Sequence, residues 1–148
     1  MSFLVDTNVL LELVAAQPHP AMLAWVDAAD EGSLFISVLS VGELQRGVAK
    51  LPDSRRRRRL AGWLTSDLLV RFASRLLPID GPVALAWGSL VEEVEAAGRP
   101  MPAVDSLLAA TARTHNLTLV TRNTADFEAA DIELLDPWEY DDARPSLE

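Results

Sequence analysis

The sequence contains no cysteine and only two histidines, and these absences limit the chemistry open to it. Without cysteine there can be no disulfide, no thiolate zinc site and no cysteine nucleophile. His19 and His115 lie far apart along the chain and form no His-x-x-x-His pair. Any metal ion would therefore be held mainly by oxygen ligands, which favours Mg²⁺ or Mn²⁺ over zinc or copper.

The sequence also lacks a long apolar run near its start. Asp6 and Glu12 interrupt the first apolar segment before it could act as a signal peptide or span a bilayer, and no basic segment precedes it. We therefore expect a soluble, cytoplasmic protein without membrane contact. The length of 148 residues, 49% of them hydrophobic, fits one domain with a substantial core.

Positive charge is scarce, and the formal net charge of −9 would ordinarily argue against a nucleic-acid partner. The negative charge is concentrated at the end of the chain, however. Nine acidic side chains lie between Asp126 and Glu148, against Arg144 alone. The other residues include 12 basic and 13 acidic side chains and are nearly neutral. The net charge therefore does not exclude a polyanionic substrate.

Short apolar runs rich in β-formers alternate with segments whose apolar residues recur at helical spacing. This alternation predicts an α/β fold, with a central, mostly parallel sheet of about four to five strands and helices on both faces. Expected strands lie at 3–5, 34–38, 76–80, 117–121 and 132–135, with helices between them. Pro78 costs this third strand a ladder bond, which indicates either a strand end or an edge strand. We expect one domain over residues 1–138 and an acidic tail over 139–148.

Acidic and polar side chains follow the predicted strands repeatedly. Asp6 comes directly after the first strand, and Glu43 lies about one helical turn beyond the second. Asn123 and Asp126 follow the fourth strand, whereas Asp105 is placed less directly, by starting a helix after a stiff loop. For Asp6 alone, a simple helix N-cap is the plainer interpretation. The recurrence favours one shared site at the carboxyl edge of the sheet, where open α/β sheets bind ligands.

Several carboxylates in one place repel one another unless a cation neutralises them. Magnesium suits such a site, and a metal held there can activate water and stabilise the charge on a phosphoryl group. This chemistry is phosphodiester hydrolysis without a protein nucleophile. The chain has no Gly-x-Ser-x-Gly elbow, no P-loop and no Gly-x-Gly-x-x-Gly segment, which disfavours serine hydrolases, NTPases and dinucleotide binders.

Two further features have a structural and a functional interpretation each. The run Arg55, Arg56, Arg57, Arg58 and Arg59 is either a solvated helix face or a patch that binds phosphates or a partner. Trp25 and Trp63 are either core residues or the lining of a groove for an amphipathic partner helix.

Four segments of the chain resemble the PIN-domain ribonucleases of the VapC and FitB type. They are Leu4-Val5-Asp6-Thr7-Asn8, Ser40-x-x-Glu43-x-x-x-Gly47, an Asp105-x-x-x-Ala-Ala-Thr-Ala helix and Leu119-Val120-Thr121-Arg122-Asn123-x-x-Asp126-Phe127. The resemblance implies that Asp6, Glu43 and Asp105 bind the metal and that Thr7, Asn8, Ser40 and Thr121 support the site. Some relatives carry aspartate where this chain has Asn123, so either Asn123 is a neutral ligand or Asp126 replaces it. Arg122 is a further candidate for contact with RNA or a partner.

The resemblance implies a Mg²⁺-dependent endoribonuclease, with Mn²⁺ as an alternative ion, acting as the toxin of a type II toxin–antitoxin pair. It also implies an RNA substrate, a cognate antitoxin, a homodimer and higher hetero-oligomers with the antitoxin. A second hypothesis is a weakly catalytic or non-catalytic binding module in a DNA-bound regulatory complex. A third, with Asp6 as a phosphate acceptor in a phosphatase or receiver domain, is weaker, because the single lysine, Lys50, follows a helix rather than a strand.

Overall fold

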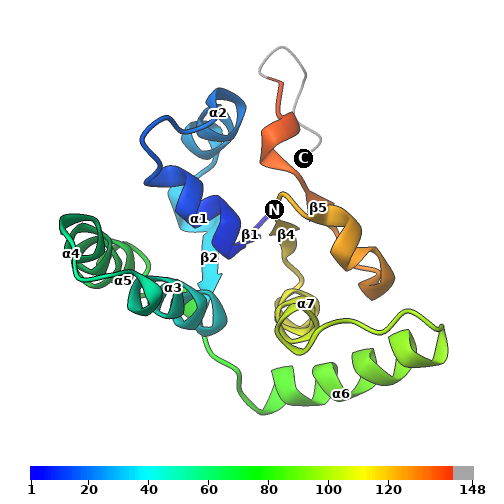
Figure 1. The fold of residues 1–148 in the computed structure, drawn as a ribbon. Helices are drawn as coiled ribbons and strands as arrows, with labels where there is room; N and C mark the ends of the chain where they lie inside the picture. The colour runs from blue at the N-terminus through cyan, green and yellow to red at the C-terminus, as the bar shows by residue number, and fades with distance from the viewer. Residues whose placement is uncertain (142–148) are drawn as a thin grey trace.

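Five short strands form a single parallel sheet in the centre of the molecule (Figure 1). The computed structural model describes residues 1–141. The strands are β1 (Phe3–Val5), β2 (Leu34–Ser37), β3 (Leu76–Leu77), β4 (Thr118–Val120) and β5 (Leu134–Leu135). They pair in the order β3-β2-β1-β4-β5, and each pair is parallel. The predicted α/β class, strand number and parallel pairing are confirmed.

Helices cover both faces of this sheet (Figure 1). The α-helices are α1 (Thr7–Leu13), α2 (Pro20–Ala28), α3 (Val38–Lys50), α4 (Arg55–Gly62), α5 (Leu69–Arg71), α6 (Gly81–Ala96) and α7 (Ala103–His115). Shorter turns are η1 (Glu31–Ser33), the π-helical η2 (Trp63–Leu68), η3 (Thr124–Ala130) and η4 (Pro137–Glu139). In the part of the chain that is described, no helix is both long and apolar enough to cross a membrane.

Alternating side chains of each strand build two separate cores. In β1, Phe3 and Val5 join α1, α2, α3 and η2 on one face, whereas Leu4 joins α6, α7 and η3 on the other. β2 and β4 divide their residues in the same way, because successive side chains of a strand point to opposite faces. For this reason, the sequence of a strand that is buried on both faces is a continuous apolar run.

Trp25 and Trp63 belong to the first of these cores. Trp25 is 6% exposed and meets the Phe3 ring edge-to-face, with ring centroids 5.1 Å apart. Trp63 is half-buried against the same cluster. Both tryptophans are therefore packing residues, and the hypothesis that they line a partner groove receives no support from their positions.

Some predicted boundaries differ from the structure. The third strand ends at Leu77 rather than at residue 80, because the proline at 78 has no N–H to donate to a ladder. It is nevertheless the expected edge strand. The helix that carries Asp105 begins at Ala103, so this carboxylate lies in its first turn rather than at its start. Of the predicted tail, residues 142–148 lie outside the described part of the chain, and Glu139 closes a short 3₁₀ turn.

A salt-bridge cluster at Glu31 ties the segment before β2 to the segment before β3. Arg71 binds the Glu31 carboxylate through two nitrogens, at 2.9 and 2.7 Å, and Arg75 donates to it at 2.7 Å. Arg75 also donates to the Leu34 carbonyl at 2.8 Å and stacks on the Phe72 ring, 4.6 Å from its centroid. Hydrogen bonding by Arg71, the largest cause, lowers the pKa of Glu31 to about 2.

We predict that Glu31→Gln destabilises the protein at neutral pH and destabilises it less at about pH 3. The pKa of Glu31 is lowered in the fold, so its contribution is complete above its unfolded value and disappears as the pH falls toward about 2. The side chain is half exposed, which limits the loss to about 1 kcal/mol. Urea denaturation at neutral pH and at about pH 3 measures the difference, with the exposed Glu95→Gln as control. An equal loss at both pH values would contradict this assignment.

Candidate active site

The predicted acidic site lies where the strand order of the sheet reverses. Strands β2 and β3 extend from one side of β1, and β4 and β5 from the other. Asp6 follows β1 and Thr121 follows β4, and the two strand ends are joined by a hydrogen bond from the Asp6 N–H to the Val120 carbonyl, 2.9 Å long. The two residues therefore stand side by side at the carboxyl edge, at the topological switch point of the sheet.

Asp6 is buried, with 8% of its surface exposed, and holds several hydrogen bonds. Its Oδ1 accepts from the Thr7 backbone N–H at 2.7 Å, so Asp6 also serves as the N-cap of α1. Its Oδ2 accepts from the Thr121 hydroxyl at 2.8 Å and from the Asn8 amide at 3.4 Å. Burial nevertheless raises the pKa of Asp6, and the charge of Glu43 adds to this effect, although Thr7 and Thr121 oppose it.

Asn8 and Thr121 form a small network that holds Asp6 in place. The Asn8 amide also donates to the Thr121 hydroxyl oxygen at 3.1 Å, and the Asn8 carbonyl oxygen accepts from the Arg122 N–H at 3.2 Å. The Thr121 hydroxyl oxygen accepts a further bond from the Asn123 N–H at 3.1 Å. This network links the first turn of α1 to the segment after β4.

Glu43 joins the site through the first turn of α1. The Thr7 hydroxyl donates to Glu43 Oε1 at 2.7 Å, which connects α3 to the start of α1. Ser40 lies one turn earlier on α3 and is fully buried, and its hydroxyl has no hydrogen-bond partner among residues 1–141. The structure thus joins Glu43 and Thr7 directly, but it shows no bond between Ser40 and the other predicted site residues.

Asp105 and Asp126 face a common cleft of about 450 Å³, lined also by Arg99, Met101 and Ala129. Asp105 is half-buried in the first turn of α7, and Asp126 is exposed in η3. Burial raises the pKa of Asp105, and the negative charges of Asp6, Asp126 and Glu43 raise it further. Four carboxylates from four segments of the chain are therefore close enough to interact electrostatically.

Asn123 has a different environment from Asp126. Its backbone carbonyl accepts from the Asp126 N–H at 3.1 Å, and its side chain makes no cap bond to η3. Asn123 is exposed, and in the described chain its recorded hydrogen bonds involve only its backbone. Asp126 is thus the residue of this pair whose charge acts on Asp105.

No cationic side chain neutralises these carboxylates within residues 1–141. The ion pairs formed there are Arg58–Asp53, Arg71–Glu31, Arg75–Glu31, Arg99–Glu128 and Arg113–Glu93. Arg122 stacks on Trp138, with its guanidinium carbon 5.2 Å from the ring centroid. In that same range, no three histidine or acidic side chains lie close enough together to hold one ion. The donor chemistry suits a hard cation, and the side chains stand apart from one another.

The arginine run forms the first turns of α4, capped by the Ser54 hydroxyl on the Arg57 N–H at 3.1 Å. Arg57 donates to the Leu51 carbonyl at 3.2 Å, and Arg58 pairs with Asp53 at 3.2 Å. The guanidinium groups of Arg55, Arg56 and Arg59 are exposed and enter none of the ion pairs that the described chain forms. Two arginines of the run thus have structural roles, and three are available to solvent.

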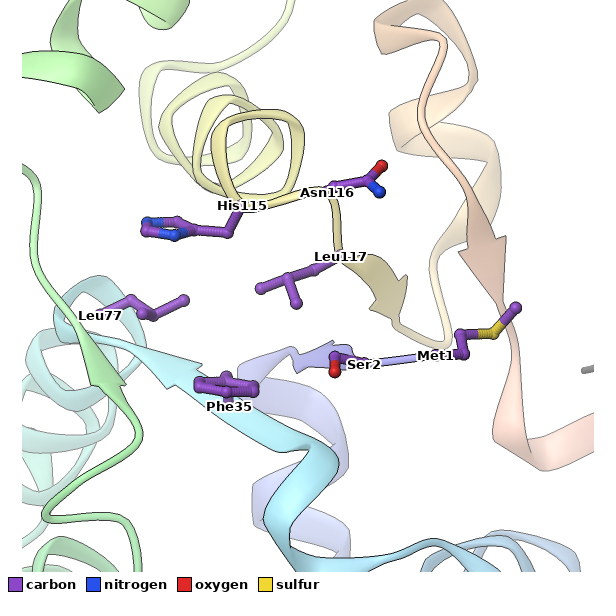
Figure 2. Close-up of a pocket in the computed structure, with 7 residues that line it drawn as sticks. All are labelled: Met1, Ser2, Phe35, Leu77, His115, Asn116 and Leu117. Carbon is purple, nitrogen blue, oxygen red and sulfur yellow. The ribbon is translucent and has the colours of Figure 1, made fainter.

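A second hollow, of about 400 Å³, holds none of the predicted site residues (Figure 2). It is lined by Ser2, which precedes β1, by Asn116 and Leu117, which precede β4, and by the His115, Phe35 and Leu77 side chains. It therefore lies beside the amino ends of the central strands, away from Asp6 and Thr121.

Sequence reasoning did not identify Arg99 as a site residue. Arg99 lines the cleft that holds Asp105 and Asp126, yet it lies outside the four motif segments. Its position between Gly98 and Pro100 indicates the end of a helix but gives no indication of function. Only the tertiary packing of residues 99–102 beside η3 reveals it.

Comparison with known proteins agrees with this arrangement. The PIN domain sequence profile matches residues 3–133. The chain is 36% identical over 135 residues to the VapC ribonuclease Y4jK of Sinorhizobium fredii, across 91% of this chain and 96% of that protein. It is 37% identical to toxin FitB of Neisseria gonorrhoeae, across 91% and 97%. A chain in the structure of FitAB bound to an IR36 DNA fragment superposes with a TM-score of 0.88 at 33% identity, covering 96% of this chain and 99% of that one. The chain therefore belongs to the PIN domain family.

Proposed function

We propose that this protein is a Mg²⁺-dependent endoribonuclease. The observation that carries the proposal is the group of four interacting carboxylates, Asp6, Glu43, Asp105 and Asp126, which no cation pairs with in residues 1–141. Carboxylates that repel one another without a counter-ion lower the stability of the fold, and a divalent cation would relieve that repulsion. The relatives named ribonucleases support RNA as the substrate.

Asp6, Glu43 and Asp105 are the residues that would hold the ion, with Mn²⁺ able to replace Mg²⁺. Their donor set is oxygen only, as these ions prefer, and binding would draw the three side chains toward one point. When bound, such an ion lowers the pKa of its water and stabilises charge on a phosphoryl group. We assign the fourth ligand position to Asp126, because its negative charge acts on Asp105. The Asn123 backbone carbonyl accepts from the Asp126 N–H and so has a structural role in this turn.

Thr7, Asn8 and Thr121 orient the acids. Thr7 donates to Glu43, and Thr121 donates to the Asp6 oxygen that is not capping α1. These bonds limit the rotation of both carboxylates, and the bond from Thr121 opposes the rise in the pKa of Asp6 that burial causes.

We also propose that the protein acts as a toxin restrained by a partner antitoxin. FitB, a relative of nearly equal length, is named a toxin, and it is seen in a FitAB assembly on DNA. A homodimer and higher hetero-oligomers with the antitoxin are part of this proposal. The DNA-bound assembly also fits a module that only binds its partner, and the loss of activity in acid-site variants separates the two functions.

We predict that Asp105→Asn abolishes RNA cleavage and raises the melting temperature of the metal-free protein by a few °C. Removing one charge ends its repulsion by Asp6, Asp126 and Glu43, so the fold gains stability as the function is lost. Cleavage of a labelled single-stranded RNA with Mg²⁺, and thermal melts in EDTA, measure the two effects. Asp6→Asn should also be inactive, whereas the exposed Asp67→Asn should retain activity.

The same variants test directly whether the acidic site binds Mg²⁺. Mg²⁺ should raise the melting temperature of the unaltered protein and leave that of Asp105→Asn almost unchanged, because only the ionised site binds the ion. Cleavage by Asp105→Asn equal to that of the unaltered protein would overturn the metal-site proposal. Retention of partner binding together with no cleavage by any variant, with either ion, would support the binding module instead.

Thr121→Val should raise the Mg²⁺ concentration needed for half-maximal activity by about 10- to 100-fold, the effect typical of a lost bond to a metal ligand. Valine keeps the shape of this buried residue and removes the hydroxyl that donates to Asp6. Thr121→Ser keeps the hydroxyl and should restore most of the affinity. A Mg²⁺ titration of cleavage rates compares the three proteins, and an unchanged midpoint in Thr121→Val would show that the bond does not matter.

The available arginines of α4 can be tested as a phosphate-binding patch. Replacing Arg55, Arg56 and Arg59 with glutamine leaves the bonds of Arg57 and Arg58 intact. If the three contact phosphates, the slope of log K against log salt for single-stranded RNA should become shallower by about 2. Fluorescence anisotropy over a salt series measures the slope. A slope equal to that of the unaltered protein would identify this run as a solvated face.

A further inference from the structure

The cleft of about 450 Å³ is lined in part by Asp105 and Asp126. Its remaining lining residues are Arg99, Pro100, Met101, Pro102, Ala125 and Ala129. We propose that this cleft binds one nucleotide of the RNA next to the scissile phosphate, with Arg99 contacting a phosphate oxygen and Met101 contacting the base. The inference rests on the proposed ribonuclease function and assigns a substrate position to it.

The size and lining of the cleft fit such an occupant. Its volume falls within the range of small-ligand sites, and its walls combine a few charged groups with apolar ones. The apolar side is formed by two proline rings, the Met101 thioether and two alanines. None of the residues that line it is aromatic, so base contacts here would depend on shape rather than on stacking. We therefore expect this position to accept all four bases.

The backbone of Arg99 is held in place by the end of α6. Gly98 adopts a left-handed conformation, with φ of +72°, and the Arg99 N–H donates to the Val94 carbonyl at 2.8 Å. Together with the bond from the Gly98 N–H to the Glu95 carbonyl, 3.0 Å long, this is a Schellman turn. Pro100 and Pro102 restrict the next residues. The wall that carries Arg99 is therefore ordered before any ligand binds.

The Arg99 guanidinium is available to a phosphate. Its side chain is 56% exposed, and its ion pair with Glu128 is long, at 3.9 Å. Such an exposed pair contributes little in water, whereas an arginine fork can bind a phosphate through two nitrogens. Arg99 is the only cationic residue among those that line the cleft, which also holds two carboxylates. A phosphate entering here meets repulsion from Asp105 and Asp126 and attraction from Arg99.

This balance of charges leads to opposite effects for two substitutions. Arg99→Gln should raise KM for a labelled single-stranded RNA by about three- to tenfold, as expected for one charge-assisted hydrogen bond in water, with a smaller change in kcat. Glu128→Gln removes a competitor for Arg99 and a negative charge at the rim, so it should lower KM by about twofold. Steady-state cleavage with Mg²⁺ measures both. Met101→Ala should weaken the binding of RNA substrates by a similar factor whatever their base composition.

Matched controls separate a local contact from a change in total charge. Lys50→Gln and Glu92→Gln remove the same charges from exposed positions outside the cleft and should leave KM nearly unchanged. Binding of fluorescein-labelled RNA in an Asp6→Asn background gives a readout independent of cleavage. There, Arg99→Gln should raise Kd by about the same factor as it raises KM.

The outcomes distinguish this inference from the function on which it rests. If Arg99→Gln behaves like Lys50→Gln in both assays while Asp105→Asn is inactive, the cleft assignment is wrong and the ribonuclease proposal stands. If the unaltered protein cuts no RNA yet Arg99→Gln weakens RNA binding, the ribonuclease proposal fails and the contact stands. If Arg99→Gln weakens only the complex with a protein partner, the cleft is a partner site and the inference is overturned.

Discussion

The burial of one carboxylate at the end of the central strand is the constraint on which the site depends. Asp6 lies where β1 ends beside β4, and its own N–H completes the pairing of these two strands. The carboxylate cannot move to solvent without breaking its bonds to Thr7 and Thr121. Burial raises its pKa, and the chain tolerates that cost through hydrogen bonds rather than through a basic partner. This arrangement leaves no basic side chain in the place of the proposed cation within the described chain.

The other acids occupy less constrained positions, and this difference follows from the fold. Glu43 is exposed on α3 and is held by one hydroxyl, whereas Asp126 is exposed in a 3₁₀ turn. Asp105 is half-buried and faces the charges of the other three acids, and burial together with those charges raises its pKa. One fixed acid and three less constrained ones would suit an ion whose ligands must reach octahedral positions at short distance.

The order of elements was predictable because the central strands are largely buried on both faces and helices such as α3 and α6 bury apolar residues at helical spacing. Asp6, Glu43 and Asp126 could be found because each follows a strand in sequence, and parallel strands bring their ends to one edge. Pro78 correctly indicated an edge strand, although it ended that strand earlier than expected. The Glu31 cluster and the position of Arg99 were not predictable, because no sequence period connects the partners. Arg71 and Arg75 lie 40 and 44 residues from Glu31, and Glu128 lies 29 residues from Arg99.

The charge distribution is compatible with the proposed binding of RNA by an acidic protein. Cations paired with these acids would block a metal ion, and in the described chain the nearby arginines interact with other groups. Arg99 is held at the rim of the cleft by a helix end, and Arg122 is held on the Trp138 ring. Each therefore lies near the acids in the fold without neutralising them. An RNA backbone bound at this edge would meet Arg99 and Arg122 near the acids, and the proposed metal ion would supply positive charge between its phosphates and the carboxylates.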